Sequence, residues 1–182
     1  MGYADHGGTK AAMPSSWFDP HFGYQRFGYL GASAQYQFLA DRHKGFQNVL
    51  HIAGLTLTES ATVRGALDRR SGYAAMQKLM ALPEPPTAIC IDNNLAGIGA
   101  IRAMNNAGKV WGRDVSVIMY DGVGSDSVIR SAVTSLLQAT PARAGQIMAN
   151  MLLARLRGAA PESQQVLLSQ ILEPGTSDGP LP

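Results

Sequence analysis

The chain has one cysteine, little charge and no long apolar run. Its single cysteine, Cys90, excludes a disulfide framework and a cysteine-rich metal cluster, and a small buried thiol is the expected role. No apolar stretch approaches the length of a membrane span, and no charged segment followed by an apolar one opens the chain. We therefore expect no membrane partner, no export and a cytoplasmic location.

Charged residues make up 15% of the 182 positions, and the formal net charge is +2. So weak and scattered a balance does not indicate a surface for nucleic acid. Apolar residues make up 46%, which is typical of a globular domain with a real core. The composition therefore favours a folded domain over a disordered chain.

The most informative part of the chain is residues 86–121. Residues 87–91 form a short apolar run bounded by prolines before it and polar residues after it, which predicts a buried strand. From Asn93 the apolar residues recur every three positions up to a helix stop at 107–108, which predicts a helix. The apolar run 114–120 predicts a second buried strand. Together these segments form a βαβ unit, with two parallel strands joined by a helix.

The rest of the chain alternates strands and helices in the same way. We expect further strands over 25–30, 55–63, 133–137 and around 166–171, and further helices over 35–53, 71–82 and 141–157. The recurring apolar residues are Leu95, Ile98, Ile101 and Met104 in the central helix and Tyr36, Leu39, Phe46, Val49, Leu50 and Ile52 in the helix over 35–53. The helix over 71–82 is expected to turn Tyr73, Met76, Leu79 and Met80 inward. This alternation predicts an α/β fold with a doubly wound, mainly parallel sheet.

Polar residues follow both strands of the central unit. Ligands of open parallel α/β sheets bind in the crevice beyond the carboxyl ends of the strands. Asn93 and Asp121 stand at these ends, so the sequence places them where a bound molecule would lie. Residues 1–20 show no periodicity and are expected to form an irregular tail, and the segment from 174 onward is expected to be loose.

With these segments in place, the chain resembles the effector-binding region of the LacI/GalR family of bacterial transcription regulators. The resemblance covers residues 21–178 in order. The stretches that carry it are Gly23 to Gly31, Arg42 to Phe46, Ser71 to Tyr73, Pro86 to Ile89, Asn93 with Gly99 to Ala103, Asp114 to Ile118 with Tyr120 and Asp121, and Val133 and Thr134 leading to Gln138.

The resemblance implies a periplasmic-binding-protein-like type I fold, in which a small effector, often a sugar or nucleobase, lies between two lobes. It assigns residues 21–178 mostly to the second lobe, with a crossover helix over 141–157 that in relatives returns to the first lobe, and it leaves 179–182 as a loose end. A helix-turn-helix, a hinge helix and the first lobe would precede residue 25, so the chain is expected to be truncated at its N-terminus. The crossover helix would then lack its partner, although it carries a wide apolar stripe.

The same resemblance points to three ligand-binding residues. Arg42 falls where relatives place an arginine that donates to ligand oxygens, although an exposed helix arginine is the alternative. Asn93 can donate to and accept from a hydroxyl, and a helix cap is an equally good account of it. Asp121 is suited to accept from paired hydroxyls, and its alternative is a turn residue before a glycine.

Two further positions complete the expected site. Relatives often stack an aromatic ring on the ligand from the position occupied here by Leu67, so the usual aromatic surface is missing and a smaller or less planar effector fits. Gln138, beside the crossover, is a further candidate contact. No metal and no cofactor are expected.

The resemblance also implies a homodimer. Ile98 and Ile129 match positions through which relatives pair their second lobes, while burial in the domain core is the alternative for Ile98. Ile129 lies in a polar segment that gives little support for burial.

Three kinds of function compete for this chain. The first is the ligand-sensing part of a transcription regulator, which would contact DNA only through a missing N-terminal domain. The second is the solute-binding protein of a sugar transporter, which shares the fold but requires an export signal. The third is an enzyme, for which Asp92, Asp121 and His43 could serve as acid or base, but no nucleophile pair, metal cluster or phosphate loop supports it. We expect the first.

Overall fold

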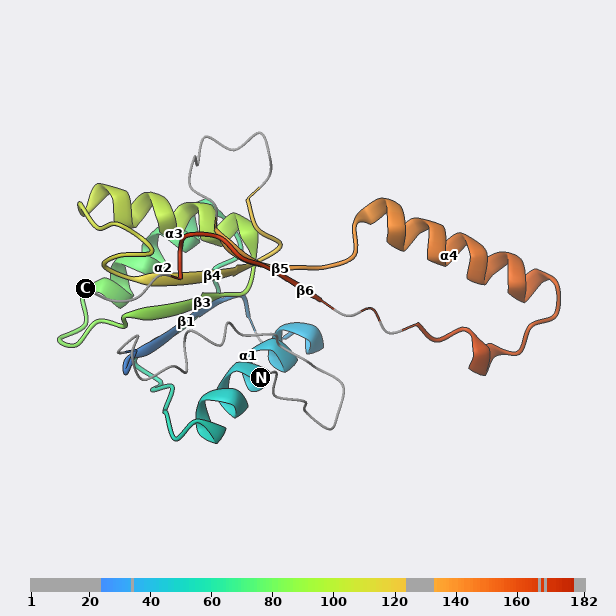
Figure 1. Ribbon diagram of the computed structural model, residues 1–182, viewed down its shortest axis with the longest axis horizontal. Coiled ribbons are helices and arrows are strands. Elements are labelled where there is room, and N and C mark those ends of the chain that lie inside the picture. Colours follow the sequence, from blue (N-terminus) through green and yellow to red (C-terminus); the bar gives the residue numbers. More distant parts are fainter. Residues whose placement is uncertain (1–23, 34, 124–132, 167, 169, 179–182) are drawn as a thin grey trace.

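The computed structural model describes residues 24–33, 35–123, 133–166, 168 and 170–178. Its strands form one sheet in the order β2-β1-β3-β4-β5-β6 (Figure 1). The elements are β1 (Phe27–Gly31), α1 (Gln37–Ile52), β2 (Thr62–Arg64), α2 (Arg69–Met80), β3 (Ala88–Ile91), α3 (Asn94–Asn106), β4 (Ser116–Tyr120), β5 (Thr134–Leu137), α4 (Pro141–Leu156), a short 3-10 helix (Pro161–Ser163) and β6 (Ile171–Glu173).

The sheet is parallel from β2 through β5, and β6 adds an antiparallel edge. The chain runs from β1 outward to β2 and then returns to the other side of β1 with β3. The strand order therefore reverses at β1 and β3, and a doubly wound sheet opens its crevice at such a point. These pairings confirm the predicted fold class.

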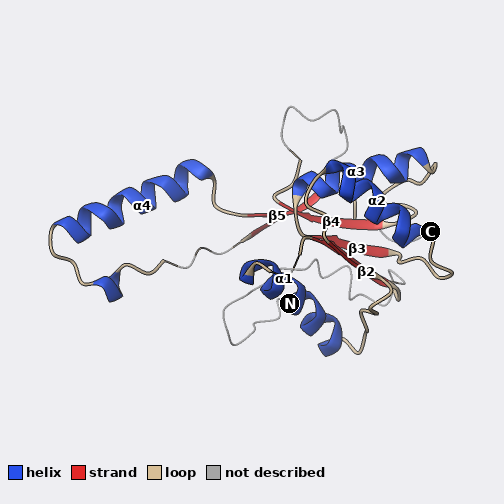
Figure 2. Ribbon diagram, turned by 180° about the vertical axis from the view of Figure 1, so that it is seen from behind, coloured by secondary structure: helices blue, strands red, loops and turns tan. Residues whose placement is uncertain are grey.

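Helices cover both faces of the sheet (Figure 2). On one face α2 and α3 bury Met76, Leu79, Ile101 and Met104 in a core that includes Ile89 and Val117 of the strands. On the other face Phe46 and Leu50 of α1 belong to a core with Tyr29, Cys90 and Ile118. The predicted buried thiol of Cys90 is confirmed, since its sulfur lies in this second core.

Helices α2 and α3 pack at backbone distance. A Cβ atom on Gly72 would lie 2.1 Å from the carbonyl oxygen of Ala96, and one on Gly99 would lie 1.9 Å from that of Arg69. Only glycine permits this approach. The close contact also sets the rotation of α3 about its own axis.

That rotation decides which of the recurring apolar residues of α3 are buried. In α3 the small residues Ala96, Ala100 and Ala103 are buried beside Ile101 and Met104, whereas Leu95 is 44% exposed and Ile98 is half-buried. Of the apolar set of α1, Leu39, Phe46 and Leu50 are buried and Val49 is half-buried, whereas Tyr36 and Ile52 are exposed. Periodicity alone does not fix which side of a helix meets two neighbours at once.

The predicted strand over 55–63 is too long. Ala61 N donates to the Thr58 carbonyl at 3.2 Å and Thr62 N donates to the Glu59 carbonyl at 3.1 Å. These local bonds close a turn, so β2 begins only at Thr62. The last strand is likewise confined to β6, and Val166 and Leu168 are exposed outside it.

The segment after β6 was expected to be loose, and this is wrong up to residue 178. Ser177 is buried, and its Oγ accepts from Thr134 N at 2.8 Å and donates to the Val117 carbonyl at 2.6 Å. Its own carbonyl accepts from Val117 N at 2.7 Å. Ser177 therefore ties β4 to β5.

Helix α4 extends away from the rest of the domain (Figure 1). It has the expected proline in its first turn and a cap from Thr140, yet none of its residues is buried. Its apolar residues Met148, Leu152, Leu153 and Leu156 are between 48% and 75% exposed. Within the described ranges, no helix is both long and apolar enough to cross a membrane.

Candidate functional site

A cavity of about 680 Å³ lies at the carboxyl edge of the parallel strands. Each parallel strand contributes the residues that follow it, and the first turns of α1 add one side. The lining residues are Ala32, Tyr36, Phe38, Leu39, Asp41, Arg42, Leu67, Asn93, Asn94, Leu95, Asp121, Gln138 and Gln170. All five residues predicted to meet a ligand, namely Arg42, Leu67, Asn93, Asp121 and Gln138, are therefore brought to one cavity.

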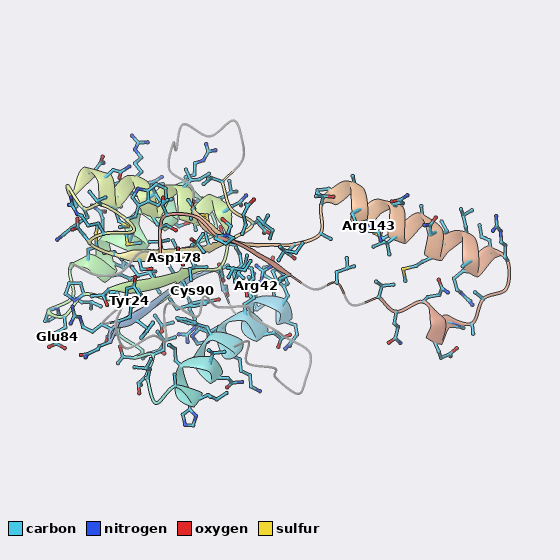
Figure 3. The ribbon with its side chains drawn as sticks, viewed as in Figure 1. Tyr24, Arg42, Glu84, Cys90, Arg143 and Asp178 are labelled. Atoms are coloured by element: carbon cyan, nitrogen blue, oxygen red, sulfur yellow. The ribbon has the colours of Figure 1, made fainter. Side chains whose placement is uncertain are left out.

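Arg42 is a buried arginine of α1, with 8% of its surface exposed. Figure 3 shows it at the sheet edge from which α4 departs, opposite Glu84. Its guanidinium carbon lies 4.1 Å from the ring centroid of Tyr120 and 5.2 Å from that of Phe38, and one terminal nitrogen donates to the Asp92 carbonyl at 2.8 Å. Within the described part of the chain no carboxylate forms an ion pair with it. The exposed-helix alternative is wrong.

Asp121 and Gln138 form a pair at the ends of β4 and β5. The Gln138 amide nitrogen donates to both carboxylate oxygens of Asp121, at 2.8 and 3.1 Å. Asp121 adopts a left-handed backbone with φ of 63°, a conformation that aspartate tolerates in turns. Both side chains are exposed at the cavity. The pair offers a carboxylate with remaining lone pairs beside an amide oxygen.

Residues 21–177 match the periplasmic binding protein-like domain family. The chain is 32% identical over 186 residues to the HTH-type transcriptional regulator RafR of Escherichia coli, an alignment that covers 94% of this chain and 55% of RafR. It is similar to the crystal structure of a transcriptional regulator from Yersinia pestis biovar Microtus str. 91001, with a TM-score of 0.83 and 33% identity over 88% of this chain and 57% of that one. A LacI-family regulatory protein from Chloroflexus aggregans gives a TM-score of 0.75 and 26% identity, over 87% and 57%.

The chain belongs to the LacI family of periplasmic-binding-protein-like domains. It spans about half the length of the relatives it matches. Those relatives are named as transcription regulators, not as enzymes.

Asp92 is a buried residue of this LacI-type domain that accepts several hydrogen bonds next to the cavity. Its buried carboxylate accepts from the Tyr29 hydroxyl at 3.1 Å, from Ala32 N at 3.0 and 3.2 Å and from the Asn93 amide at 3.0 Å. Burial raises the pKa of the Asp92 carboxyl, and the hydrogen bonds oppose that shift. These bonds hold the turns after β1 and β3 in place, so Asp92 positions the cavity residues Ala32 and Asn93 without lining the cavity itself.

His43 contacts Tyr29 but does not take part in the hydrogen bonds of Asp92. Its ring meets Tyr29 edge-on at 4.7 Å between centroids, and its buried Nε2 has no hydrogen-bond partner. Burial, followed by the nearby Arg64 guanidinium, lowers the pKa of the His43 ring. Among the described residues, the His43 Nε2 atom forms no hydrogen bond with Asp92 or Asp121, the other two conceivable acids or bases. The described residues also contain no cluster of side chains suited to hold a metal ion.

Asn93 plays the capping role that the sequence left open. Its Oδ1 accepts from Ala96 N at 2.8 Å at the start of α3, while its amide nitrogen donates to the Ala66 carbonyl at 2.9 Å and to Asp92. Both amide hydrogens are therefore used within the domain. Asn93 lines the cavity and fixes the turn after β2 to α3.

Two cavity residues were missed by sequence analysis. Tyr36 was counted only in the apolar set of α1, and Phe38 was not singled out, yet both line the cavity and are about half exposed. The spacing of Phe38 from Phe46 and Leu50 predicts a core position, so the available signal was only that Phe38 follows closely on β1. Ile129 lies outside the described residues, and Ile98 lies half-buried on α3.

Proposed function

We propose that this LacI-type domain senses a small, uncharged, polyhydroxylated effector, sugar-like in chemistry, in the cavity at the carboxyl edge of the sheet. Arg42, Asp121 and Gln138 would bind its hydroxyls, Asn93 would position the turns around it, and Leu67 would contact its apolar edge. The observation that carries the proposal is Arg42, a buried guanidinium in the cavity lining that bonds one backbone carbonyl.

The chemistry of the lining supports this ligand class. A desolvated guanidinium favours oxygen acceptors in its plane, and the Asp121 carboxylate favours hydroxyl donors, so the two together complement paired hydroxyl groups. Among the cavity residues Asp41 and Asp121 outnumber the single cation Arg42. This balance disfavours an anionic effector. The similar regulator CelR was solved as a complex with cellobiose, at a TM-score of 0.72 and 27% identity over 85% of this chain and 47% of CelR.

The proposal extends to the whole regulator. We infer that residues 21–178 form mostly the second lobe of the effector-binding domain and that α4 packs on a first lobe. The effector would shift the DNA-binding heads of a homodimer through lobe closure, and DNA would be contacted by a helix-turn-helix outside this chain. Such a regulator acts in the cytoplasm and catalyses no reaction. A solute-binding protein of a transporter is the alternative, and the regulator names of the relatives favour the first.

The decisive experiment is a binding titration of the 182-residue chain with cellobiose and other neutral mono- and disaccharides, followed by heteronuclear NMR. We expect saturable shifts for residues of the cavity. Arg42→Lys, which loses the planar fork, is expected to weaken binding about tenfold or more. Arg143→Lys, at an exposed arginine of α4, is the matched control and should bind like the parent. If no neutral sugar gives saturable shifts, the proposed ligand class is wrong.

The dimer has its own test. Ile129→Asp is expected to convert a dimer to a folded monomer in sedimentation, because a charge cannot be buried unpaired at a two-fold contact. An unchanged mass would remove Ile129 from the interface.

A further inference from the structure

Four large apolar side chains are exposed in the one cavity that holds Arg42. Tyr36 is 48% exposed, Phe38 55%, Leu67 52% and Leu95 44%, and all four line it. Exposed apolar surface that gathers in a concave site marks a place where a ligand or partner is bound. The cavity therefore combines the polar groups of the proposed effector site with an apolar surface that those groups do not explain.

The aromatic part of this surface is ordered by its neighbours. The Arg42 guanidinium carbon lies over the rings of both Tyr120 and Phe38, at 4.1 and 5.2 Å from their centroids. The Phe38 ring in turn meets Tyr36 at 6.0 Å with 32° between the ring planes. Since Tyr120 is buried in the sheet, this series of contacts anchors two exposed rings to the core.

Core packing does not account for Phe38. The buried residues of α1 are Leu39, Arg42, Phe46 and Leu50, whereas Phe38, one turn before Arg42 at the start of the helix, is 55% exposed. An aromatic side chain that is more than half exposed gains little from the domain's own core. Ile52, at the far end of α1, is also exposed but does not line the cavity.

We infer that Tyr36 and Phe38 form an aromatic platform on which the ring of the effector stacks, and that this platform selects cyclic sugars over open-chain polyols. The inference rests on the proposed function. A pyranose presents one face of C–H groups, which packs flat on an aromatic ring while its hydroxyls reach Arg42 and Asp121. An open-chain alditol carries the same kinds of hydroxyl but has no such face. The aromatic surface thus lies on α1, and Leu67 after β2 supplies only an aliphatic edge.

The test compares substitutions at Phe38 in the 182-residue chain. The probes are glucose and galactose, each paired with its open-chain alditol, glucitol and galactitol. Phe38→Leu keeps the apolar bulk and removes the ring, and it is expected to weaken sugar binding about tenfold without changing the weak binding of the alditols. Ile52→Ala is the matched control on the same helix. Because Phe38 is exposed, we expect the melting temperature to stay unchanged in both variants.

Phe38→Trp gives a readout that a purely structural role would not produce. It is expected to retain sugar binding and to report saturation by a change of tryptophan emission that the parent chain lacks. Three results would overturn the inference: sugar affinity equal in Phe38→Leu and parent, alditols that bind as tightly as their sugars, or no emission change in Phe38→Trp on saturation. In these cases loss of binding in Arg42→Lys would leave the proposed function standing. If no sugar binds the parent, the proposed function falls and the aromatic platform with it.

Discussion

Helices α3 and α4 begin alike and end up in different surroundings. Each follows a parallel strand, and each starts at a polar cap that accepts a backbone hydrogen bond, Asn93 from Ala96 N at 2.8 Å and Thr140 from Arg143 N at 3.2 Å. Helix α3 has 13 residues and buries seven of them, whereas α4 has 16 and buries none. Local sequence thus specified both helices, but only neighbouring elements decided which of them is part of the core.

The difference lies in small residues at the points of contact. Helix α3 meets α2 through Gly99 and Gly72, and its Gly97 lies against Met119 of β4, so its backbone comes close to its neighbours. Gly145 of α4 has no heavy atom within 4 Å of the position of a Cβ. The stability of the domain should therefore depend on α3 and hardly at all on α4.

A methionine in each helix gives the largest contrast. Met104 is fully buried, so Met104→Ala is expected to lower the free energy of unfolding by about 2–5 kcal/mol through lost contacts and a cavity. Met148 is 68% exposed, and Met148→Ala should change the free energy of unfolding by less than about 0.5 kcal/mol. Urea denaturation followed by circular dichroism measures both. Similar losses in the two variants would show that α4 is packed in solution.

The glycines sharpen the contrast at the backbone. Gly99→Ala places a Cβ against the Arg69 carbonyl and must push α2 away, which is expected to cost about 1–3 kcal/mol. Gly145→Ala meets open space and should stabilise α4 locally by up to about 1 kcal/mol through helix propensity. Urea denaturation measures the loss of global stability in Gly99→Ala, and amide hydrogen exchange within α4 measures the local gain in Gly145→Ala. A neutral Gly99→Ala would contradict the close helix contact.

Removal of the two N-caps is expected to give the smallest difference in stability between α3 and α4. Asn93→Ala removes the cap of α3 and the bond to the Ala66 carbonyl, for an expected loss of about 1–2 kcal/mol in global stability. Thr140→Ala should weaken α4 by about 1 kcal/mol, visible only as faster exchange in its first turn. Equal global losses would mean that α4 unfolds together with the sheet.

Much of the site could be predicted from sequence because its residues follow apolar runs. Asn93 and Asp121 each come just after a buried strand, and parallel strands bring such positions to the same edge. Leu95 could not be placed in this way, because the rotation of α3 depends on its contact with α2. Phe38 was missed for a related reason. Phe38 stands four residues before Arg42 and eight before Phe46, so helical spacing alone predicts a core position for it. In the first turn of α1 it lines the cavity instead.

The segment after β6 shows what no local pattern contains. Nothing around Ser177 in the sequence indicates a buried residue, because its partners Val117 and Thr134 lie 60 and 43 positions earlier. Its burial is a property of the completed sheet.

This distance has a consequence for the order of folding. During synthesis Val117 leaves the ribosome first, and its amide and carbonyl reach their partner only when Ser177 has also emerged, 60 residues later. Closing so long a loop adds little free-energy cost over a shorter one, but contacts of high sequence separation form slowly. The contact between β4 and β5 at Ser177 is therefore expected to be among the last to form, while the βαβ unit from β3 to β4 closes over a much shorter loop.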